Sequence, residues 1–363
     1  MNQLPPDDFA SQDDSERISA PGWEAIDQAL IGIYPKQQAQ HFGTIISYAM
    51  GGPDPLNGIS IYESYSTQTH RHLITFGFSD LFEKTTEDPE VSGFGFELTF
   101  RLAGKHDPQN PPNWAMNFLQ NLGRYVFETG NVFGPGHTMP LNGPICGDSD
   151  TKIEAITFVE DPELPPIATP NGQVTFLQIV GLTLDELEAV ERWNAREFCK
   201  LRAKFDPKLV TDIDRDSWLK DPAFAEAVAE GTRRDGSSSA SLYTPEVTFK
   251  PASNVILPPT IVVPAIAAAS LAHRLAGRIP FGREFELISE KKTILFTPGN
   301  TVRWEMEEDQ LTVTLNSEAA MAISHSLAPK AGKFSIPAAS GLIFEVQRTT
   351  IRDQKGNVKS VIG

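Results

Sequence analysis

The chain has little of what several classes of protein require. Of its 363 residues only Cys146 and Cys199 are cysteines, too few for a disulfide framework or a four-thiolate metal site. The longest apolar run, 261–271, contains Pro264 and is shorter than the ~20 residues that span a bilayer. The acidic, proline-containing start lacks the apolar core of a signal peptide. We therefore expect a soluble, cytoplasmic protein with free thiols and no membrane partner.

Recognisable catalytic motifs are also missing. The chain has no glycine-rich loop that ends in Lys-Ser or Lys-Thr, no G-x-S-x-G and no H-E-x-x-H. The pair Gly93 and Gly95 lacks the third glycine of a dinucleotide fingerprint and leads into a predicted strand instead of a helix. The sequence therefore predicts no enzyme and no cofactor.

The charge is distributed unevenly. The net charge is −16, with 31 basic and 47 acidic side chains. Residues 241–363 carry 13 basic and 11 acidic side chains, a net charge of +2, so residues 1–240 carry −18. Because such an acidic half repels phosphate backbones, we expect no nucleic-acid partner. It would instead attract a cationic partner, although acidity that serves only solubility is the alternative.

Three short segments carry the side chains that could support chemistry. His70 and His72 lie two residues apart on a predicted strand, which turns both imidazoles to one face, and a metal would need Asp80, Glu97 or His137 as a third ligand. Ordinary polar positions at a strand edge are the alternative interpretation. A Gly-Pro-Gly loop ends at His137, and Glu160-Asp161 ends a strand with two carboxylates that could receive a cationic group. A metal-dependent enzyme that uses His70 and His72 thus remains the alternative to a binding protein.

The apolar patterning predicts an α+β chain without the regular alternation of a doubly wound sheet. Helices are expected to begin at Pro21, after Pro111-Pro112 and at Asp221, and to span 183–205 and 317–326. Thr183 and Glu186 form a predicted capping box for the helix over 183–205. Strands are expected at 44–49, 70–78, 95–102, 153–159, 174–180, 247–249, 285–288, 293–296, 301–305, 311–315 and 341–348.

A change of composition divides the chain. The segment RRDGSSSAS at 233–241 is rich in glycine and serine, which is typical of a linker. We therefore predict a loose leader at 1–20, an N-terminal domain at 21–235, a linker at 236–245 and a smaller, strand-rich C-terminal domain at 246–363.

Several segments together resemble the Suppressor of fused family. In the first half they are GGPDPL (51–56), HRHLITFGFSDL (70–81), SGFGFELTFRL (92–102), GRYVFETGNVF (123–133), VEDPEL (159–164) and TFLQIVGLTLDEL (175–187). The second half is similar through LAGRIPFGREF (275–285) and FSIPAASGLIFEV (334–346).

The resemblance implies two mixed α/β-sheet domains joined by a hinge, and no enzymatic activity. Animal members hold a transcription-factor segment as an added β-strand between the domains. Backbone pairing there supplies affinity, and pockets for side chains supply specificity. Because this chain lacks the long insertion that animal members carry within the second half, and only RRDGSSSAS occupies the junction, it resembles the bacterial members. The implied partner is a protein or peptide, and the implied role is that of a regulator or of an immunity protein that neutralises a toxin.

The resemblance also implies four partner-binding positions. The tyrosine of the RYVF motif falls on Tyr125, and the glutamate of the EDP motif falls on Glu160. The acidic residue of the aromatic-glycine loop is replaced by His137, and the apolar residue before the LxGR motif by His273. Since two of the four positions depart from the animal pattern, we expect the same binding site to accept a different partner.

Overall fold

The computed structural model describes residues 19–46, 48–65, 68–105, 107–147, 149–244, 246–251, 258–352 and 356–363. The chain divides into two compact units. The first unit combines Met1–Leu187 with Arg196–Trp218, and the second combines Glu188–Ala195 with Leu219–Gly363. None of the helices within the described ranges is long and apolar enough to cross a membrane.

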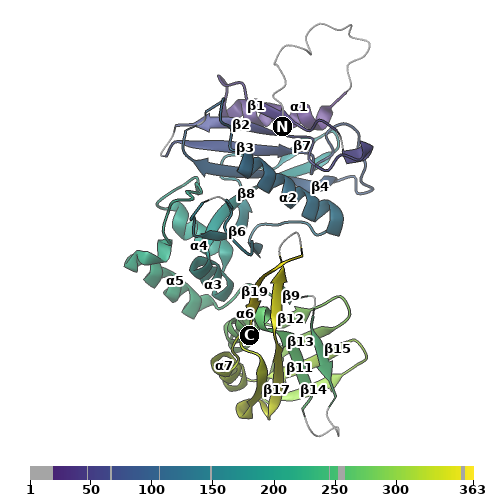
Figure 1. The fold of residues 1–363 in the computed structure, drawn as a ribbon, viewed down its shortest axis with the longest axis vertical. Helices are drawn as coiled ribbons and strands as arrows, with labels where there is room; N and C mark the ends of the chain where they lie inside the picture. The colour runs from purple at the N-terminus through teal and green to yellow at the C-terminus, as the bar shows by residue number, and fades with distance from the viewer. Residues whose placement is uncertain are drawn as a thin grey trace. The chain divides into compact units, whose positions relative to one another are not determined.

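The first unit is built on one mixed sheet, drawn in purple to teal in Figure 1. The strand order is β1-β2-β3-β4-β8-β6-β5, with β7 also paired to β8. The strands are β1 (Gln40–Gly43), β2 (Gly58–Ser64), β3 (His70–Phe76), β4 (Val91–Ala103), β5 (Thr138–Pro140), β6 (Ile153–Glu160), β7 (Ile167–Thr169) and β8 (Gly172–Thr183). Strand β8 is parallel to β4 and antiparallel to β6.

Helices cover both faces of this sheet. Successive side chains of a strand point to opposite faces, and Leu73 and Ile74 of β3 accordingly enter different cores. Leu73 belongs to the core with α2 (Asn113–Thr129), and Ile74 belongs to the core with α1 (Pro21–Ile33). The sheet is therefore the middle of three layers, and its central strands are buried on both sides.

The predicted helix over 183–205 is two helices, α3 (Leu184–Arg192) and α4 (Ala195–Ala203). One of the two hydrogen bonds of the predicted capping box is present: the Glu186 carboxylate accepts from the Thr183 N–H at 3.0 Å, whereas the Thr183 hydroxyl donates to the Asp185 carboxylate. The break follows from Trp193, whose carbonyl accepts a hydrogen bond from Ser238 and whose indole lies against Gly231. The single-helix prediction was wrong because the apolar spacing continues through the break.

The second unit contains two mixed sheets and a separate antiparallel strand pair. The strand orders are β10-β11-β17-β16, β14-β15-β13-β12-β9 and β18-β19. The strands are β9 (Ser241–Tyr243), β10 (Thr248–Lys250), β11 (Thr260–Pro264), β12 (Phe285–Ile288), β13 (Thr293–Pro298), β14 (Arg303–Met306), β15 (Gln310–Leu315), β16 (Gly332–Ile336), β17 (Leu342–Gln347), β18 (Thr349–Arg352) and β19 (Val358–Ile362).

Among its described residues the second unit contains α5 (Pro222–Asp235), α6 (Ala265–Arg278), α7 (Ser317–Ser326) and the end of α3 from Glu188 onward. Residues of α6, α7 and both larger sheets share one apolar core, in which Leu271, Ile323 and Phe344 are fully buried. The described residues also form the short 3-10 helices η1 (Tyr48–Met50), η2 (Trp218–Lys220), η3 (Ile279–Phe281) and η4 (Pro337–Ala339). The α+β prediction is confirmed, and α7 has the predicted bounds.

Two local expectations differ from the structure. Of the strand expected at 44–49, residues 44–46 form no strand and Tyr48–Met50 form η1, while β1 lies earlier in the chain. The described residues of the expected linker, 236–244, are part of the second unit, where β9 pairs in parallel with β12 and Ser237 is fully buried. The leader expected at 1–20 lies almost wholly outside the described residues.

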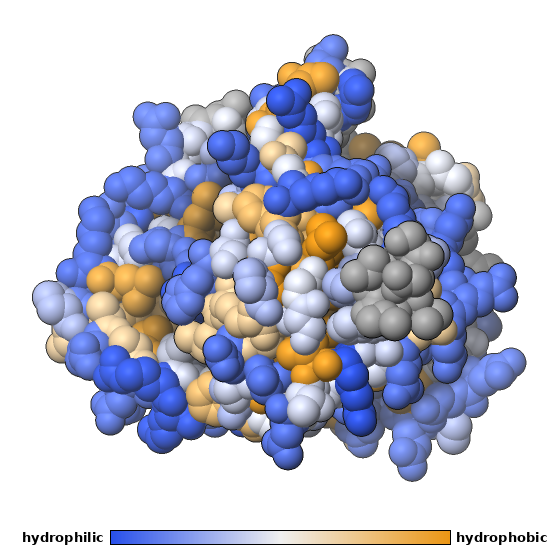
Figure 2. Space-filling view, turned by 90° about the horizontal axis from the view of Figure 1, so that it is seen from below, coloured by the Kyte–Doolittle hydropathy of each residue, from blue (hydrophilic) through white to orange (hydrophobic). Residues whose placement is uncertain are grey.

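Exposed apolar side chains of the second unit are scattered along the sequence. They are Tyr243, Ile266, Phe281, Met306, Met321, Val358 and Val361. On the face seen in Figure 2, hydrophobic residues lie in separate small groups between hydrophilic ones.

Candidate functional site

The end of β6 leaves part of a sheet edge open. The short strand β5 pairs only with Ala155–Thr157, and the loop before it continues the pairing to Phe158. There the Gly136 N–H donates to the Phe158 carbonyl (2.7 Å), and the Phe158 N–H donates to the His137 carbonyl (3.1 Å). In an antiparallel strand every second residue turns its peptide groups to the same side. The peptide groups of Glu160 therefore face this edge, and no described residue continues the pairing there.

Three stacked aromatic rings lie beside this edge. The Tyr125 ring of α2 stacks on Phe133 at a centroid distance of 5.7 Å, and Phe133 stacks on Phe158 at 4.3 Å. Phe133 and Phe158 are buried, but Tyr125 is 37% exposed. The Tyr125 hydroxyl accepts a hydrogen bond of 3.2 Å from the Asn131 amide. Tyr125 thus presents to solvent a ring and a hydroxyl whose positions are fixed by the buried rings of Phe133 and Phe158.

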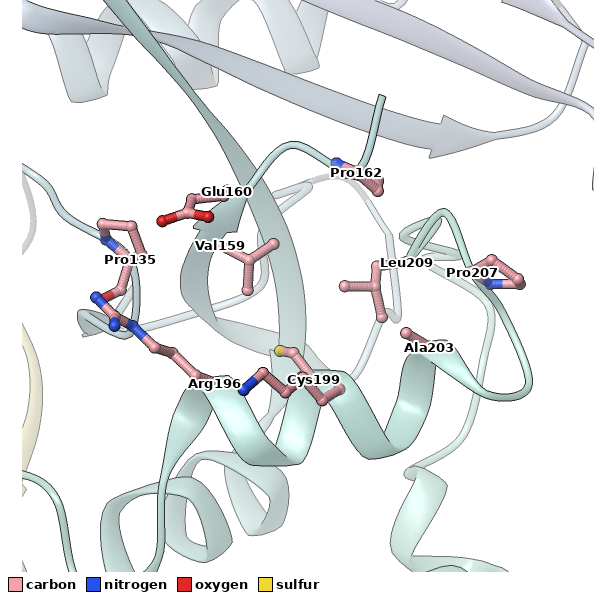
Figure 3. A pocket seen from close by; sticks show the side chains of 10 residues that line it. Pro135, Val159, Glu160, Pro162, Arg196, Cys199, Ala203, Pro207 and Leu209 are labelled. Atoms are coloured by element: carbon pink, nitrogen blue, oxygen red, sulfur yellow. The ribbon is translucent and has the colours of Figure 1, made fainter. Parts of the chain in front are cut away.

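A pocket of about 310 Å³ opens next to Glu160. Figure 3 shows Val159, Glu160 and Pro162 on its strand side and Arg196, Cys199 and Ala203 of α4 on the other. Pro135 of the loop that ends at His137 also lines it. The Glu160 side chain is exposed, whereas Val159 is 9% exposed and Cys199 2%. The pocket therefore has a charged mouth and an apolar interior.

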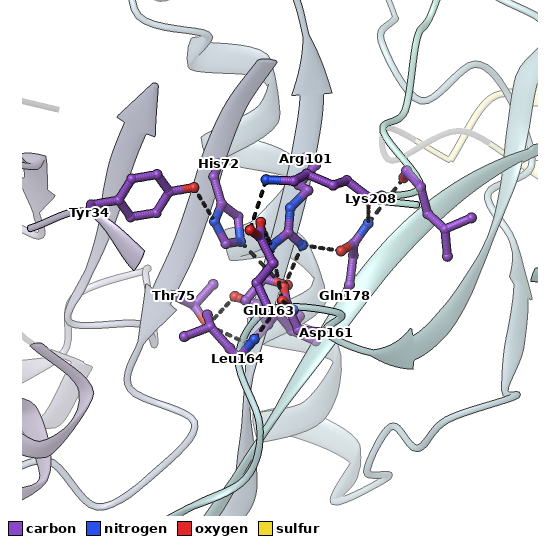
Figure 4. A network of polar contacts seen from close by, with 12 residues as sticks. Tyr34, His72, Thr75, Arg101, Asp161, Glu163, Leu164, Gln178 and Lys208 are labelled. Carbon is purple, nitrogen blue, oxygen red and sulfur yellow. Dashed lines mark hydrogen bonds and ion pairs between the residues drawn. The ribbon is translucent and has the colours of Figure 1, made fainter. Parts of the chain in front are cut away.

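A buried polar network lies directly behind the Glu160 turn (Figure 4). The fully buried guanidinium of Arg101 donates to both carboxylate oxygens of Asp161, at 2.6 and 3.0 Å. It also contacts Glu163 at 3.1 Å and the side-chain oxygen of Gln178. Burial alone would raise the pKa of Asp161, but hydrogen bonding from His72 and the charge of Arg101 outweigh it and hold that pKa well below its usual range.

The two histidines considered as metal ligands are both buried in this region. His72 accepts or donates a 2.9 Å hydrogen bond with the Tyr34 hydroxyl and lies 3.4 Å from Asp161. Burial, aided by the charge of Arg101, lowers the pKa of His72 to about 4. His70 contacts the Gln68 carbonyl at 2.7 Å. Within the described ranges no group of three or more His, Cys, Asp or Glu side chains could hold a metal ion.

The residues considered as third metal ligands have other surroundings. The Glu97 carboxylate is fully buried and accepts hydrogen bonds from Thr75 and Ser79. Asp80 accepts from the backbone of Thr85 and Gly93. These contacts hold turns of the chain together, so the structure offers no support for a metal centre on His70 and His72.

The predicted partner-binding residues fall into both units. Tyr125, His137 and Glu160 lie in the first unit, and the loop of His137 joins the Tyr125 stack to the β6 edge. His273 lies on α6 in the second unit, where its ring contacts Arg192 at 2.9 Å. Burial, aided by the charge of Arg192, lowers the pKa of His273 against the opposing charge of Glu188.

The fold and site thus define an α+β protein whose most distinctive surface is an open strand end beside an aromatic stack and a pocket. Residues 52–216 match the family profile "Suppressor of fused protein (SUFU)". The human and mouse Suppressor of fused homologs are 36% identical to this chain over 223 residues, 57% of this chain and 46% of each homolog. The match therefore spans about half the length of these relatives.

Solved structures agree with the sequence comparisons. The crystal structure of Drosophila Suppressor of Fused is similar with a TM-score of 0.74 and 25% identity, over 93% of this chain and 99% of the other. A chain of the Sufu–Fu complex is similar with a TM-score of 0.54 and 35% identity, over 58% of this chain and 98% of the other. This chain belongs to the Suppressor of fused family, and the resemblance seen in its motifs is confirmed.

Sequence reasoning missed much of the site. Arg196 and Cys199 line the pocket because α4 lies across it from the end of β6, and their spacing gives no sign of this. Arg101 and Gln178 lie on adjacent strands, and the two residues are 77 positions apart in sequence. One available signal was Arg101 itself, which lies between Phe100 and Leu102 in a predicted strand, since a buried arginine requires a buried partner.

Proposed function

We propose that this protein binds an extended segment of another polypeptide at the open end of β6, and that it performs no chemistry on that partner. The observation that carries the proposal is the unpaired edge at Glu160, beside the exposed ring of Tyr125. A strand added there would gain main-chain hydrogen bonds, and contacts with neighbouring side chains would make the binding specific for certain partner sequences. A relative crystallised in a Sufu–Fu complex supports a protein partner.

In this proposal the side chains have distinct roles. Glu160 receives a cationic or hydrogen-bond-donating group, and Tyr125 offers an aromatic face with a fixed hydroxyl. His137 is exposed at the end of the loop and contacts the same segment. His273 is proposed as a contact that the second unit contributes to the partner.

The biological role proposed for this binding is that of a bacterial regulator or of an immunity protein that neutralises a toxin. Purification of the tagged protein from its native host, with the Glu160→Arg variant in parallel, would test this role. A toxin or regulator held by the wild type and lost from the variant would support it. Recovery of the same partner with both proteins would contradict binding at Glu160.

The binding site itself can be tested without the natural partner. A random decapeptide library displayed on phage is selected on the wild-type protein, and enriched peptides are synthesised. Because truncation of a central aromatic or charged contact costs ~2 kcal/mol or more, Glu160→Arg and Tyr125→Ala should each weaken peptide binding by about tenfold or more. Glu87→Arg, which changes an exposed loop residue of the same unit by the same charge, is the control. Unchanged affinity of both site variants would reject this site.

A further inference from the structure

We infer that the pocket beside Glu160 is a socket for one apolar side chain of the partner, and that the buried Arg101 network holds two of its walls. This inference rests on the proposed function, which it deepens by naming the chemistry of the side chain that is recognised. It concerns a surface formed within the first unit, by the end of β6, by α4 and by the loop 206–209.

The interior of the pocket is apolar. Val159 and Leu209 are 9% and 5% exposed and lie opposite α4. Burial, together with the nearby charge of Glu186, raises the pKa of the Cys199 thiol to about 12, so this side chain is uncharged at neutral pH. An aliphatic or aromatic side chain entering from solvent would bury its surface against these groups, at about 25 cal/mol per Å².

The charged side chains of the pocket lie at its mouth. The Arg196 guanidinium donates to the Pro135 carbonyl (3.1 Å), and the Lys200 ammonium donates to Glu197 (2.7 Å). Glu160 is exposed. A charged partner side chain placed deeper would lose its hydration and meet no opposite charge on the apolar floor, which is unfavourable. The arrangement therefore selects an apolar side chain for the interior.

The first wall of the pocket is the turn that follows β6. The carboxylate of Asp161 accepts hydrogen bonds from the N–H groups of Glu163 and Leu164, at 2.8 and 3.0 Å. The same carboxylate is held by Arg101 from β4. These contacts fix the positions of Glu160 and Pro162, which flank Asp161 in the chain.

The second wall is the loop 206–209, which the same network holds. The Gln178 amide donates to the carbonyls of Lys208 and Leu209, at 2.7 and 3.0 Å, while its oxygen accepts from Arg101. The two walls are joined directly by the Lys208–Glu163 ion pair of 2.8 Å. Arg101 thus reaches both walls, and walls that are already held in place bind a side chain without a cost for their own ordering.

Blocked amino-acid amides test the socket without any polypeptide partner. N-acetyl-L-leucinamide and N-acetyl-L-phenylalaninamide should show saturation-transfer NMR signals with the wild-type protein, and the lysine and aspartate amides should not. Ala203→Phe places a ring in the pocket and should abolish the signals. Lys204→Phe adds the same ring at an exposed position that does not line the pocket, and it should preserve them. Equal signals from the charged amides, or signals that persist in Ala203→Phe, would overturn the inference.

The selected decapeptides provide a second measurement. One apolar position of an enriched peptide should lose at least tenfold in affinity when it is replaced by alanine, and this loss should disappear in Ala203→Phe. Ala203→Met fills less space and serves if the phenylalanine variant fails to fold by circular dichroism. Peptides that depend on Glu160 but on no apolar position would refute the socket and leave the proposed function standing. Amide binding without any enriched peptide would refute the proposed function and leave the socket standing.

Discussion

Arg101 is the residue on which the candidate site most depends. A guanidinium taken out of water is tolerated only where carboxylates and other acceptors surround it, and Arg101 has Asp161, Glu163 and Gln178 around it. Burial works against the charged form, but Asp161 outweighs burial and raises the pKa of Arg101. Both members of the pair are therefore charged at neutral pH.

Replacement of Arg101 should destabilise the protein strongly. Arg101→Met leaves the Asp161 carboxylate buried without its partner, and such broken pairs cost about 3–5 kcal/mol. The free energy of unfolding in urea measures this loss. Arg233→Met removes an ion pair whose two side chains are 65% and 70% exposed, and it should change stability by less than about 0.5 kcal/mol. Similar values for the two variants would contradict the role given to Arg101.

The raised pKa of Asp27 predicts that replacing this residue with asparagine stabilises the protein more at neutral pH than at acidic pH. Burial, opposed by a hydrogen bond from Trp23, raises the pKa of Asp27 to about 6. A carboxyl whose pKa is raised by folding contributes stability below its unfolded pKa near 4, and this contribution is lost as the pH rises through about 6. Asparagine does not ionise, so the Asp27→Asn variant does not lose this stability as the pH rises. The melting temperature of the variant relative to wild type should therefore be higher at pH 7.5 than at pH 4, and a pH-independent difference would contradict the assignment.

At the scale of helices, replacing glycine with alanine is expected to change the melting temperature in opposite directions at two positions. A Cβ added at Gly32 of α1 would meet open space, whereas a Cβ added at Gly231 of α5 would lie 2.3 Å from the Trp193 ring. Alanine is favoured over glycine inside a helix by up to ~1 kcal/mol. Gly32→Ala should therefore raise the melting temperature, and Gly231→Ala should lower it because the indole must move. Equal shifts in calorimetry would show that Trp193 does not pack closely on α5.

The elements that sequence predicted well are those with a local signal. Asn316 caps α7 by accepting from the Ala319 N–H, and both ends of this helix follow from residues within the helix or next to it. Helix α6 was missed because its sequence is largely alanine and leucine, and the run over 261–271 continues from β11 without a change of polarity. The break between α3 and α4 depends on Gly231, which lies far along the chain.

The candidate site shows the same division between local and distant determinants. Tyr125 and Glu160 could be placed from motifs because each lies within a continuous segment that resembles the family. The pocket could not be predicted, since it requires α4, the turn after β6 and the loop 206–209 to meet. The network behind it depends on the register of β4 against β8, which no short pattern determines.

At the scale of the whole molecule, charge predicts the kinetics of partner association. Residues 1–240 carry a net charge of −18, which accelerates encounter with a cationic partner at low salt and is screened at high salt. The association rate constant of a lysine- or arginine-bearing selected peptide should fall about tenfold or more between low and high ionic strength. Its dissociation rate should change little. A neutral peptide is the control, and an equal salt dependence of its association would contradict steering.

The division of the chain has a practical consequence for any dissection of the gene. The backbone passes between the two units after Leu187, after Ala195 and after Trp218, so no single cut separates them cleanly. A fragment that starts at Leu219 lacks Trp193, and α5 would then expose the site where the indole lies over Gly231. A fragment that stops at Trp218 carries Glu188–Ala195 without its packing partners. The properties of truncated proteins would therefore reflect destabilisation caused by the truncation itself. Point variants of the full-length chain are the better way to assign roles to each unit.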